Sequence, residues 1–202
     1  MDIKEFFELC EGQWISQRTL HHIETEQTDV GKADLWIEKL DPSHESVVKA
    51  CESQNLSVDQ VVCPLEVTYK ATLQNGRTQI SSTLMIPVKS ADSDIQGQVI
   101  SIAKDKEPVL GTFSLGTDEV MTLSNQQGDT LASERIWFAS ENLRIRSITL
   151  TNEEGTSEAN FCSEIRKMGE PQPKPSADEA AQQMSPLAAW RARQAKMQSS
   201  SN

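Results

Sequence analysis

The chain has 202 residues, enough for one domain of ordinary size and an extension. A formal net charge of −11 and a pI of about 4.8 argue against nucleic acid and anionic membrane surfaces as partners. No stretch approaches the roughly 18 apolar residues of a membrane-spanning helix, and residues 1–5 lack a signal or transit pattern. We expect a soluble protein of a reducing, cytoplasm-like compartment.

The chain opens with a predicted amphipathic helix over residues 2–10. Ile3, Phe6, Phe7 and Cys10 recur there at helical spacing, which is typical of a plug over a hydrophobic core. Gly12 ends the helix.

A strand is predicted over residues 12–23. Alternation places Trp14, Ser16 and Arg18 on one face, whereas His21 and His22 point to opposite faces. A Gly-x-Trp on a first strand is similar to lipocalin-like barrels, in which the Trp closes one end under an arginine from a late strand.

Two strands flank a second predicted helix. The strands are residues 32–40 and 61–73, and the helix is residues 42–54, with proline in its first turn. Strand 61–73 alternates one apolar and one polar face. Asn75-Gly76 is a strong signal for a hairpin after it.

Further short strands follow, separated by turn signals. They are residues 79–88, 98–103, 109–115, 120–124, 130–139, 143–150 and 158–166. About ten strands in hairpin order predict a closed barrel, because closure removes exposed edges. Such a barrel can hold one small ligand.

The composition changes near residue 170. Residues 1–169 carry 27 acids and 15 bases, and residues 170–202 carry 3 acids and 4 bases. We therefore expect a barrel domain over residues 1–169. Residues 170–202 are expected to be a Pro-rich linker and a disordered or partly helical tail, with Trp190 as a docking anchor.

Residues 133–146 concentrate arginine around a tryptophan. Arginine grips carboxylates with a flat fork of donors and stacks on aromatic rings. The pattern fits either a flat, anionic, conjugated ligand or a structural closure of the barrel end by arginine over tryptophan.

The sequence offers little support for other chemistry. No nucleophile–base–acid set or Gly-rich phosphate loop occurs, and neither the histidines nor the cysteines have the spacing of a metal site. Cys51 and Cys63 lie on apolar faces, where a thiol is usually inert.

Two stretches resemble the S-type phycobiliprotein lyases, the CpcS/CpeS type. The first is Glu5-Phe6-Phe7-Glu8-Leu9 followed by Gly12-x-Trp14-x-Ser16-x-Arg18-Thr19-x-His21-His22. The second is Ser133-Glu134-Arg135-Ile136-Trp137-Phe138-Ala139-Ser140-x-Asn142-Leu143-Arg144-x-Arg146. The resemblance covers residues 1 to about 169.

The resemblance implies a mainly β fold, a ten-stranded antiparallel barrel of the lipocalin or fatty-acid-binding type with a short N-terminal helix and one inserted helix. It implies attachment of a phycobilin substrate (phycocyanobilin or phycoerythrobilin) by a thioether bond to a cysteine of an apo-phycobiliprotein subunit. The acceptor would be of the phycocyanin, allophycocyanin or phycoerythrin type. No permanent cofactor or metal is implied. The setting would be the phycobilisome-assembling cytosol of cyanobacteria or a plastid stroma. A homodimer or a second lyase subunit is compatible with it.

The resemblance also assigns site residues. Glu134 would favour protonated pyrroles and, with Arg144, act in catalysis; Arg144 and Arg146 would hold propionates; Trp137 would line the pocket or stack on the rings. The residues that would complete or close the pocket are Arg18, His21, His22, Arg135 and Trp14.

The hairpin turn leaves one alternative open. If residues 139–142 form a four-residue loop, Arg144 and Arg146 share a face with Arg135 and Trp137, and Glu134 faces away. A three-residue loop or a bulge instead brings Glu134 to the face of the two arginines.

Two other functions fit the sequence. One is a noncatalytic bilin-binding chaperone or a partner subunit of a heteromeric lyase. The other is a lipocalin-like carrier of an unrelated acid such as a fatty acid, although one carboxylate needs fewer arginines than this chain supplies.

Overall fold

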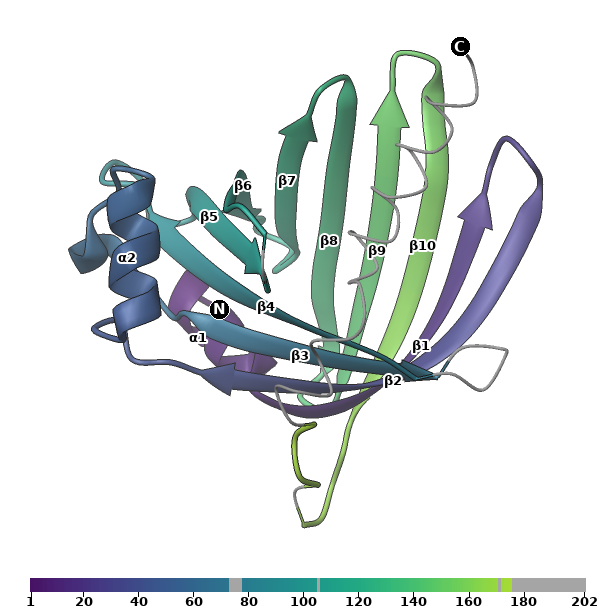
Figure 1. The fold of residues 1–202 in the computed structure, drawn as a ribbon, viewed down its shortest axis with the longest axis horizontal. Helices are drawn as coiled ribbons and strands as arrows, with labels where there is room; N and C mark the ends of the chain where they lie inside the picture. Colours follow the sequence, from purple (N-terminus) through teal and green to yellow (C-terminus); the bar gives the residue numbers. More distant parts are fainter. Residues whose placement is uncertain (73–77, 105, 171, 176–202) are drawn as a thin grey trace.

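The structure is a computed structural model that describes residues 1–72, 78–104, 106–170 and 172–175. These residues form ten antiparallel strands, two α-helices and one 3-10 helix (Figure 1). The elements in chain order are α1 (Ile3–Cys10), β1 (Gly12–His22), β2 (Gln27–Lys39), α2 (Glu45–Ser53), η1 (Val58–Gln60), β3 (Leu65–Thr72), β4 (Thr78–Lys89), β5 (Gln96–Ala103), β6 (Val109–Leu115), β7 (Met121–Gln127), β8 (Thr130–Ser140), β9 (Leu143–Asn152) and β10 (Gly155–Arg166).

Each strand pairs with the next along the chain, and β10 pairs back to β1, so the sheet closes into a barrel. The predicted mainly β barrel of ten strands with a short N-terminal helix and an inserted helix is confirmed. Closure gives each of the ten described strands a hydrogen-bonded neighbour on both sides. No helix in the described part of the chain is long and apolar enough to cross a membrane.

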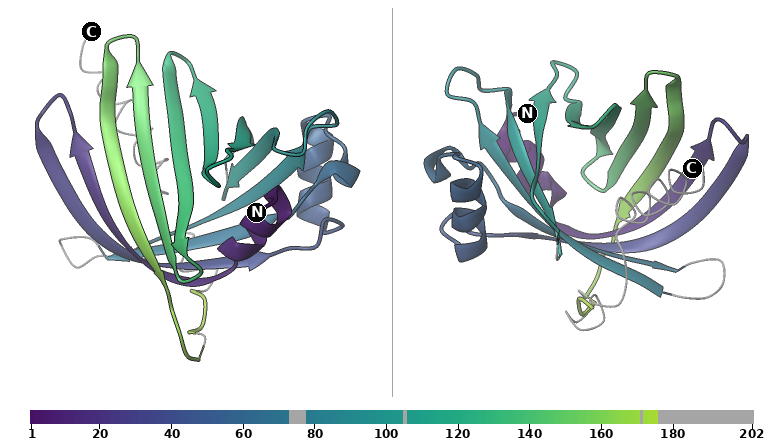
Figure 2. Two further views of the ribbon diagram at one scale, coloured as in Figure 1. Left: turned by 180° about the vertical axis from the view of Figure 1, so that it is seen from behind. Right: turned by 45° about the horizontal axis from the view of Figure 1, so that its top comes forward.

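Helix α1 covers one end of the barrel, which we call the closed end; the opposite end is the mouth (Figure 2). Its N-terminus has a capping box, because Asp2 accepts from the backbone of Glu5 and Glu5 accepts from the backbone of Asp2. Phe6 and Phe7 are almost fully buried and pack edge-to-face against Phe138 and Phe113. The predicted plug is thus a packed aromatic cluster.

Helix α2 packs on the outside of the barrel, where Val47 and Cys51 form a second core with Ile86 and Ile100. The helix starts at Glu45, three residues later than predicted. Asp41 accepts hydrogen bonds from the backbone and side chain of Ser43, and this turn competes with a helical start.

The other strand boundaries shift for local reasons. Strand β2 begins at Gln27 rather than at residue 32, because the β1–β2 hairpin pairs all the way from Gly12↔Ile37 to His22↔Gln27. Strand β3 begins at Leu65 rather than at residue 61, after Pro64, which has no backbone donor for the ladder. The Asn75-Gly76 hairpin prediction lies outside the described residues.

The segment after β10 runs along the outside of the barrel. Trp36 and Gln13 donate side-chain hydrogen bonds to the carbonyl oxygen of Gln172, at 3.0 and 2.6 Å. Lys174 forms ion pairs with Glu38 and Glu66. The start of the predicted linker is therefore held against β1–β3. The helices and the Trp190 anchor predicted for residues 176–202 lie outside the described residues.

Candidate functional site

A cavity of about 380 Å³ occupies the mouth side of the barrel interior. Its wall mixes apolar groups such as Leu35 and Val67 with hydroxyls such as Ser16 and Ser81. Arg18, Glu134, Arg146 and Glu158 add charge to this wall; a wall of this mixed kind is typical of sites for amphipathic small molecules.

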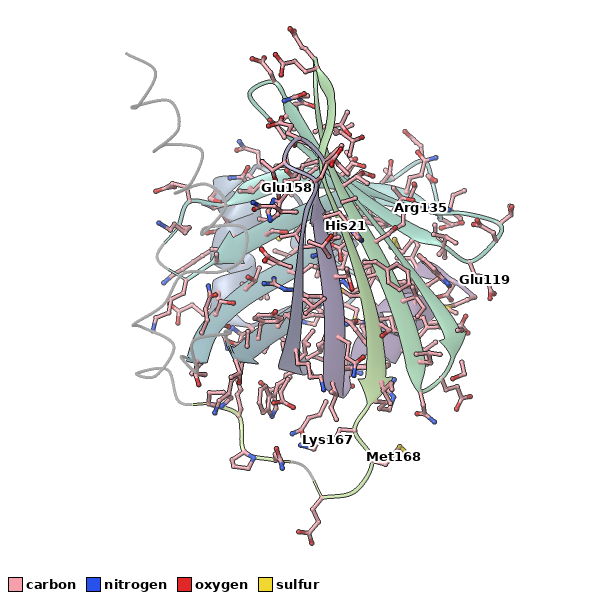
Figure 3. The ribbon with its side chains drawn as sticks, turned by 90° about the vertical axis from the view of Figure 1, so that its right-hand side faces the viewer. His21, Glu119, Arg135, Glu158, Lys167 and Met168 are labelled. Carbon is pink, nitrogen blue, oxygen red and sulfur yellow. The ribbon has the colours of Figure 1, made fainter. Side chains whose placement is uncertain are left out.

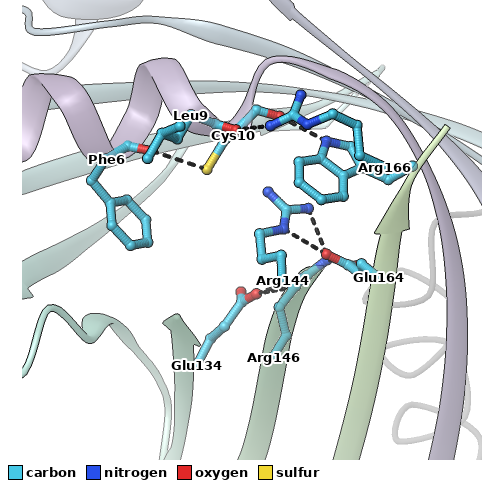
Figure 4. A network of polar contacts seen from close by, with 9 residues as sticks. Phe6, Leu9, Cys10, Glu134, Arg144, Arg146, Glu164 and Arg166 are labelled. Atoms are coloured by element: carbon cyan, nitrogen blue, oxygen red, sulfur yellow. Dashed lines mark hydrogen bonds and ion pairs between the residues drawn. The ribbon is translucent and has the colours of Figure 1, made fainter. Parts of the chain in front are cut away.

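A four-membered charge network extends from the cavity wall to a buried ion pair behind it (Figure 4). Arg144 and Glu164 are buried and paired at 2.6 Å. Arg146 donates to Glu164 at 3.1 Å and to Glu134 at 2.6 Å. The network contains two positive and two negative groups, so it is neutral as a unit, and such burial is tolerable only because each charge has a hydrogen-bonded partner.

The charges of the two arginines in the network keep the carboxylate of Glu164 ionised. Burial on its own would raise the pKa of Glu164, but the guanidiniums of Arg146 and Arg144 outweigh it and hold that pKa below its ordinary value. For Arg146, burial acts to lower the pKa, yet Glu134 and Glu164 raise it well above the usual arginine value. Both partners are therefore charged at neutral pH.

A β-bulge decides which face Glu134 takes. Phe138 pairs with Arg144, but Ser140 pairs with Leu143, so Ala139 is an extra residue on β8. The bulge alternative of the sequence analysis is the one that forms. Glu134 consequently shares the inner face with Arg144 and Arg146.

The same bulge turns Arg135 and Trp137 outward. They alternate with the inward-facing Glu134 and Ile136 on β8. Arg135 is exposed on the outer wall, 3.8 Å from Asp118 (Figure 3). The structure therefore does not bring these predicted ligand residues into the cavity.

Arg144 lies behind the cavity wall rather than in it. Its side chain is 4% exposed and does not line the cavity. The guanidinium carbons of Arg144 and Arg166 lie 5.0 and 4.2 Å from the ring centroid of Trp14. Trp14 also donates to the carbonyl oxygen of Cys10 at 2.9 Å, so it closes the barrel end beneath a late-strand arginine.

Arg18 is the arginine that faces the cavity without a counterion in the described part of the chain. Its side chain lies across Gly31, the opposite residue on β2; a Cβ at position 31 would come within 3.1 Å of the Arg18 Nε. Tyr69 also lines the cavity, and burial raises its pKa despite the opposing charge of Arg18. A guanidinium so placed is a natural site for a ligand carboxylate.

The two adjacent histidines separate. His22 faces inward near the mouth, with Asp29 and Glu158 each 3.2 Å from one of its ring nitrogens. His21 faces outward and bonds to Thr28 at 3.0 Å. Within the described residues, no group of three or more His, Cys, Asp or Glu side chains is arranged to hold a metal ion.

All four cysteines are buried and free. Burial raises the pKa of Cys63 to about 11. Cys162 lines the cavity, and burial raises its pKa although Arg146 opposes the shift. These thiols are held in the protonated, weakly nucleophilic form.

Sequence reasoning did not single out several residues that shape this site. Glu158, Asn160, Cys162 and Glu164 alternate along β10 and all face inward. The sequence signal that could have found them is alternation, which places the two carboxylates and the cysteine of β10 on one face. The two arginines of β9 also require buried counterions.

Comparisons with known proteins point in one direction. A family model described as CpeS-like protein matches residues 2–167. A chromophore lyase CpcS/CpeS of Thermosynechococcus vestitus is 37% identical over 176 residues, which cover 86% of this chain and 96% of the relative. Chromophore lyase CpcS/CpeS 2 of a Synechococcus species is 33% identical, covering 83% and 91%. The solved S-type phycobiliprotein lyase CPES from Guillardia theta matches the fold with a TM-score of 0.74 at 23% identity, covering 84% of this chain and 95% of that one.

Proposed function

This chain belongs to the CpeS-like protein family, and from that premise we propose that it is a chromophore lyase that holds a phycobilin in the barrel cavity. It attaches this linear tetrapyrrole to a cysteine of an apo-phycobiliprotein subunit. The observation that carries the proposal is the arrangement of Arg18 and the Glu134–Arg146 pair in the wall of one cavity. A bilin has two propionates, a flat π-system and pyrrole N–H groups, and this wall offers complementary groups for each.

Arg18 and Arg146 are the cavity arginines, and we assign the propionates to them. Arg18 lacks a counterion among the described residues, and Arg146 is 22% exposed at its side chain. Arg144 is reassigned from a ligand contact to a positioning residue, because it is buried behind the wall and fixes Glu164. Glu134, which is 20% exposed, accepts the pyrrole N–H groups and favours their protonated form.

The reaction is the addition of a thiol to a double bond. The acceptor's sulfur bonds to the exocyclic ethylidene carbon of ring A, and its proton ends on the neighbouring ring carbon, so no oxidant is consumed. The nucleophile belongs to the acceptor, in keeping with the burial of this chain's own thiols. The lyase contributes by fixing the bilin in one reactive conformation.

The test is a transfer assay with phycocyanobilin and an apo-phycocyanin, apo-allophycocyanin or apo-phycoerythrin subunit. The proposal is supported if bilin absorbance that survives acid denaturation appears on the acceptor band in denaturing gels, and if it appears faster with the lyase than without it. An acceptor with its cysteine changed to serine is the control for noncovalent carry-over.

Glu134→Gln should slow transfer, while Arg135→Ala, on the outer wall, should leave it unchanged. Tight binding without transfer to any acceptor would instead indicate a bilin-binding chaperone or a partner subunit.

A further inference from the structure

A second binding arrangement lies on the outside of the barrel. After Lys167 and Met168 the chain turns back toward the barrel (Figure 3). Residues 172–175, with the sequence Gln-Pro-Lys-Pro, then lie against β1, β2 and β3, and we call them the strap. The strap is held by specific contacts at two of its four residues.

The first contact is made by a cross-strand pair of donors. The register sets Gln13 of β1 opposite Trp36 of β2, and the side chains of both donate to the carbonyl oxygen of Gln172, at 2.6 and 3.0 Å. The side-chain oxygen of Gln13 also accepts from the backbone N–H of Gln172 at 3.0 Å. One residue of the strap is thus bound through both its backbone donor and its backbone acceptor.

The second contact is made by a cross-strand pair of carboxylates. Glu38 of β2 lies directly opposite Glu66 of β3, and like charges in that position destabilise a sheet. Lys174 forms ion pairs with both, while Ser82 donates to the other oxygen of Glu66 at 3.2 Å. Burial acts to lower the pKa of Lys174, but its hydrogen bonds to Glu38 and Glu66 raise it above the ordinary lysine value. The two carboxylates therefore hold one ammonium group.

The spacing of the two pairs matches that of an extended peptide. Trp36 and Glu38 are two residues apart on β2, which is about 7 Å at the usual rise of a strand. Gln172 and Lys174 are also two residues apart, which is about 6 Å in a polyproline II helix. Each of them precedes a proline, and a following proline favours an extended backbone. The strap is thus pre-organised to place one residue on each pair.

Trp36 gives this face an aromatic anchor. It alternates along β2 with Leu35, which lines the cavity, so the indole points outward. Trp36 is nevertheless only 6% exposed, and the strap that is bonded to its Nε1 is one of the groups that cover it. Aromatic side chains on the receptor are the usual means of binding proline-rich peptides.

We propose that the outer face of β1–β3 is a binding site for an extended proline-rich segment with a lysine between two prolines, and that the strap fills this site as an intramolecular ligand. The donors Gln13 and Trp36 bind the backbone of the segment, and the carboxylates Glu38 and Glu66 select its lysine. The bound strap fixes the point from which the chain continues beyond residue 175. The cavity is inside the barrel, so this site does not depend on the proposed function.

The exposure of the carboxylates sets the expected strength of each contact. The side chain of Glu38 is 52% exposed and that of Glu66 is 36% exposed. Ion pairs with so much access to water contribute little on their own. We therefore expect the backbone contacts to supply most of the affinity, and the lysine to supply selectivity that weakens when salt screens it.

A free peptide tests the site in the full-length chain. The probe is a fluorescently labelled Glu-Pro-Gln-Pro-Lys-Pro, the sequence of residues 170–175, and fluorescence anisotropy measures its binding. The triple variant Pro173→Gly, Lys174→Glu, Pro175→Gly keeps the chain length but removes the stiffness and the cation of the strap. The peptide should bind this variant at least about fivefold more tightly than the unmodified chain, in which the tethered strap competes at a roughly millimolar effective concentration.

Two controls test the selectivity. A peptide with glutamate in place of lysine should bind the triple variant more weakly than the original peptide does. Adding Glu66→Gln to the triple variant should weaken binding of the original peptide, whereas adding Glu153→Gln, in the β9–β10 turn, should leave it unchanged. The proposal is overturned if the peptide binds neither chain, if it binds both equally, or if Glu66→Gln and Glu153→Gln act alike.

Chemical cross-linking tests whether the strap occupies the site in solution. A carbodiimide joins a lysine to a carboxylate that it contacts, so Lys174 should become linked to Glu38 or Glu66 within the monomer. Gln13→Ala should lower the yield several-fold, because it removes two hydrogen bonds to the strap. Gln17→Ala, at an exposed position of the same strand, is the matched control and should leave the yield unchanged. A missing link, a link only between separate chains, or equal yields in the two variants would show that the strap is not an intramolecular ligand.

Discussion

The closed end and the mouth of the barrel are built from the same strands but handle charge in opposite ways. At the closed end, Arg144 and Glu164 are buried and paired, and the Arg144 guanidinium carbon lies 5.0 Å from the Trp14 ring centroid. Toward the mouth, Arg18 faces an open cavity with no counterion among the described residues. Charged side chains that pair with each other stabilise the fold, whereas a charged side chain without a counterion is available to bind a ligand.

The largest effect should come from breaking the closed-end network. Glu164→Gln leaves Arg144 buried and Arg146 without one of its two partners, and breaking a buried pair typically costs about 3–5 kcal/mol of unfolding free energy. Denaturant unfolding measures this loss. Glu134→Gln is the control and should cost less, because Glu134 is 20% exposed at its side chain and, among the described residues, pairs with Arg146 alone. Equal denaturant midpoints for Glu164→Gln and Glu134→Gln would contradict the view that the buried closed-end pair stabilises the fold more than the cavity carboxylate does.

The next effect concerns the mouth. Arg18→Ala should weaken phycobilin binding by about 1.5–3 kcal/mol, the usual range for a lost hydrogen bond to a charged group. It should leave stability nearly unchanged. Arg18→Lys should restore only part of the affinity, because lysine lacks the fork of donors. Fluorescence or absorbance titration with phycocyanobilin measures the affinity.

Arg135→Ala is the control for Arg18→Ala. Both arginines are ligand candidates from sequence, but Arg135 lies on the outer wall, 55% exposed at its side chain. It should bind phycocyanobilin like the unmodified chain. A loss of affinity in Arg135→Ala as large as that in Arg18→Ala would mean that the ligand does not occupy the cavity.

The sequence predicted the barrel well because alternation and turn signals are local. Trp14 and Arg18 share a face whatever the rest of the chain does. It could not place Glu134, Arg135 and Trp137, because their face depends on whether Ala139 forms a bulge, and a shift of one residue exchanges the two faces of a strand.

Glu164 was missed for a different reason. On its own strand it resembles an ordinary solvated carboxylate, and only the pairing of β10 with β9 sets it opposite Arg144. Such a residue can be identified by searching the neighbouring strands for the counterions that the arginines of one strand require. The cavity thiol Cys162 was likewise hidden until β10 closed the barrel against β1.

Acid should weaken the closed end through Glu164. Its folded pKa is below the ordinary value of 4.5, because Arg146 and Arg144 outweigh the opposing effect of burial. Its ion pairs therefore stabilise the fold fully above that ordinary pKa, and this contribution is lost as the pH falls through the folded pKa. The unfolding free energy should fall below about pH 4.5, and its pH slope should be smaller in Glu164→Gln. Parallel pH profiles for the two proteins would exclude Glu164 as the source.

The smallest effect tests how the mouth positions its free arginine. Arg18 lies across Gly31, whose φ is not in the left-handed region, so glycine serves there to leave space rather than to permit an unusual backbone. Gly31→Ala places a methyl group about 3.1 Å from the Arg18 Nε, and a flexible side chain yields to this by a few tenths of an ångström. We expect phycobilin affinity to fall by less than about 1 kcal/mol, because Arg18 keeps its charge and its donors and moves only slightly.

A double-mutant cycle separates this positioning effect from a general loss of packing. If Gly31 acts through Arg18, Gly31→Ala should lower affinity in the unmodified chain and have no effect when Arg18 is already alanine. An equal loss of affinity in the two backgrounds would mean that the methyl group obstructs the ligand directly, so that position 31 shapes the cavity wall and does not direct its arginine.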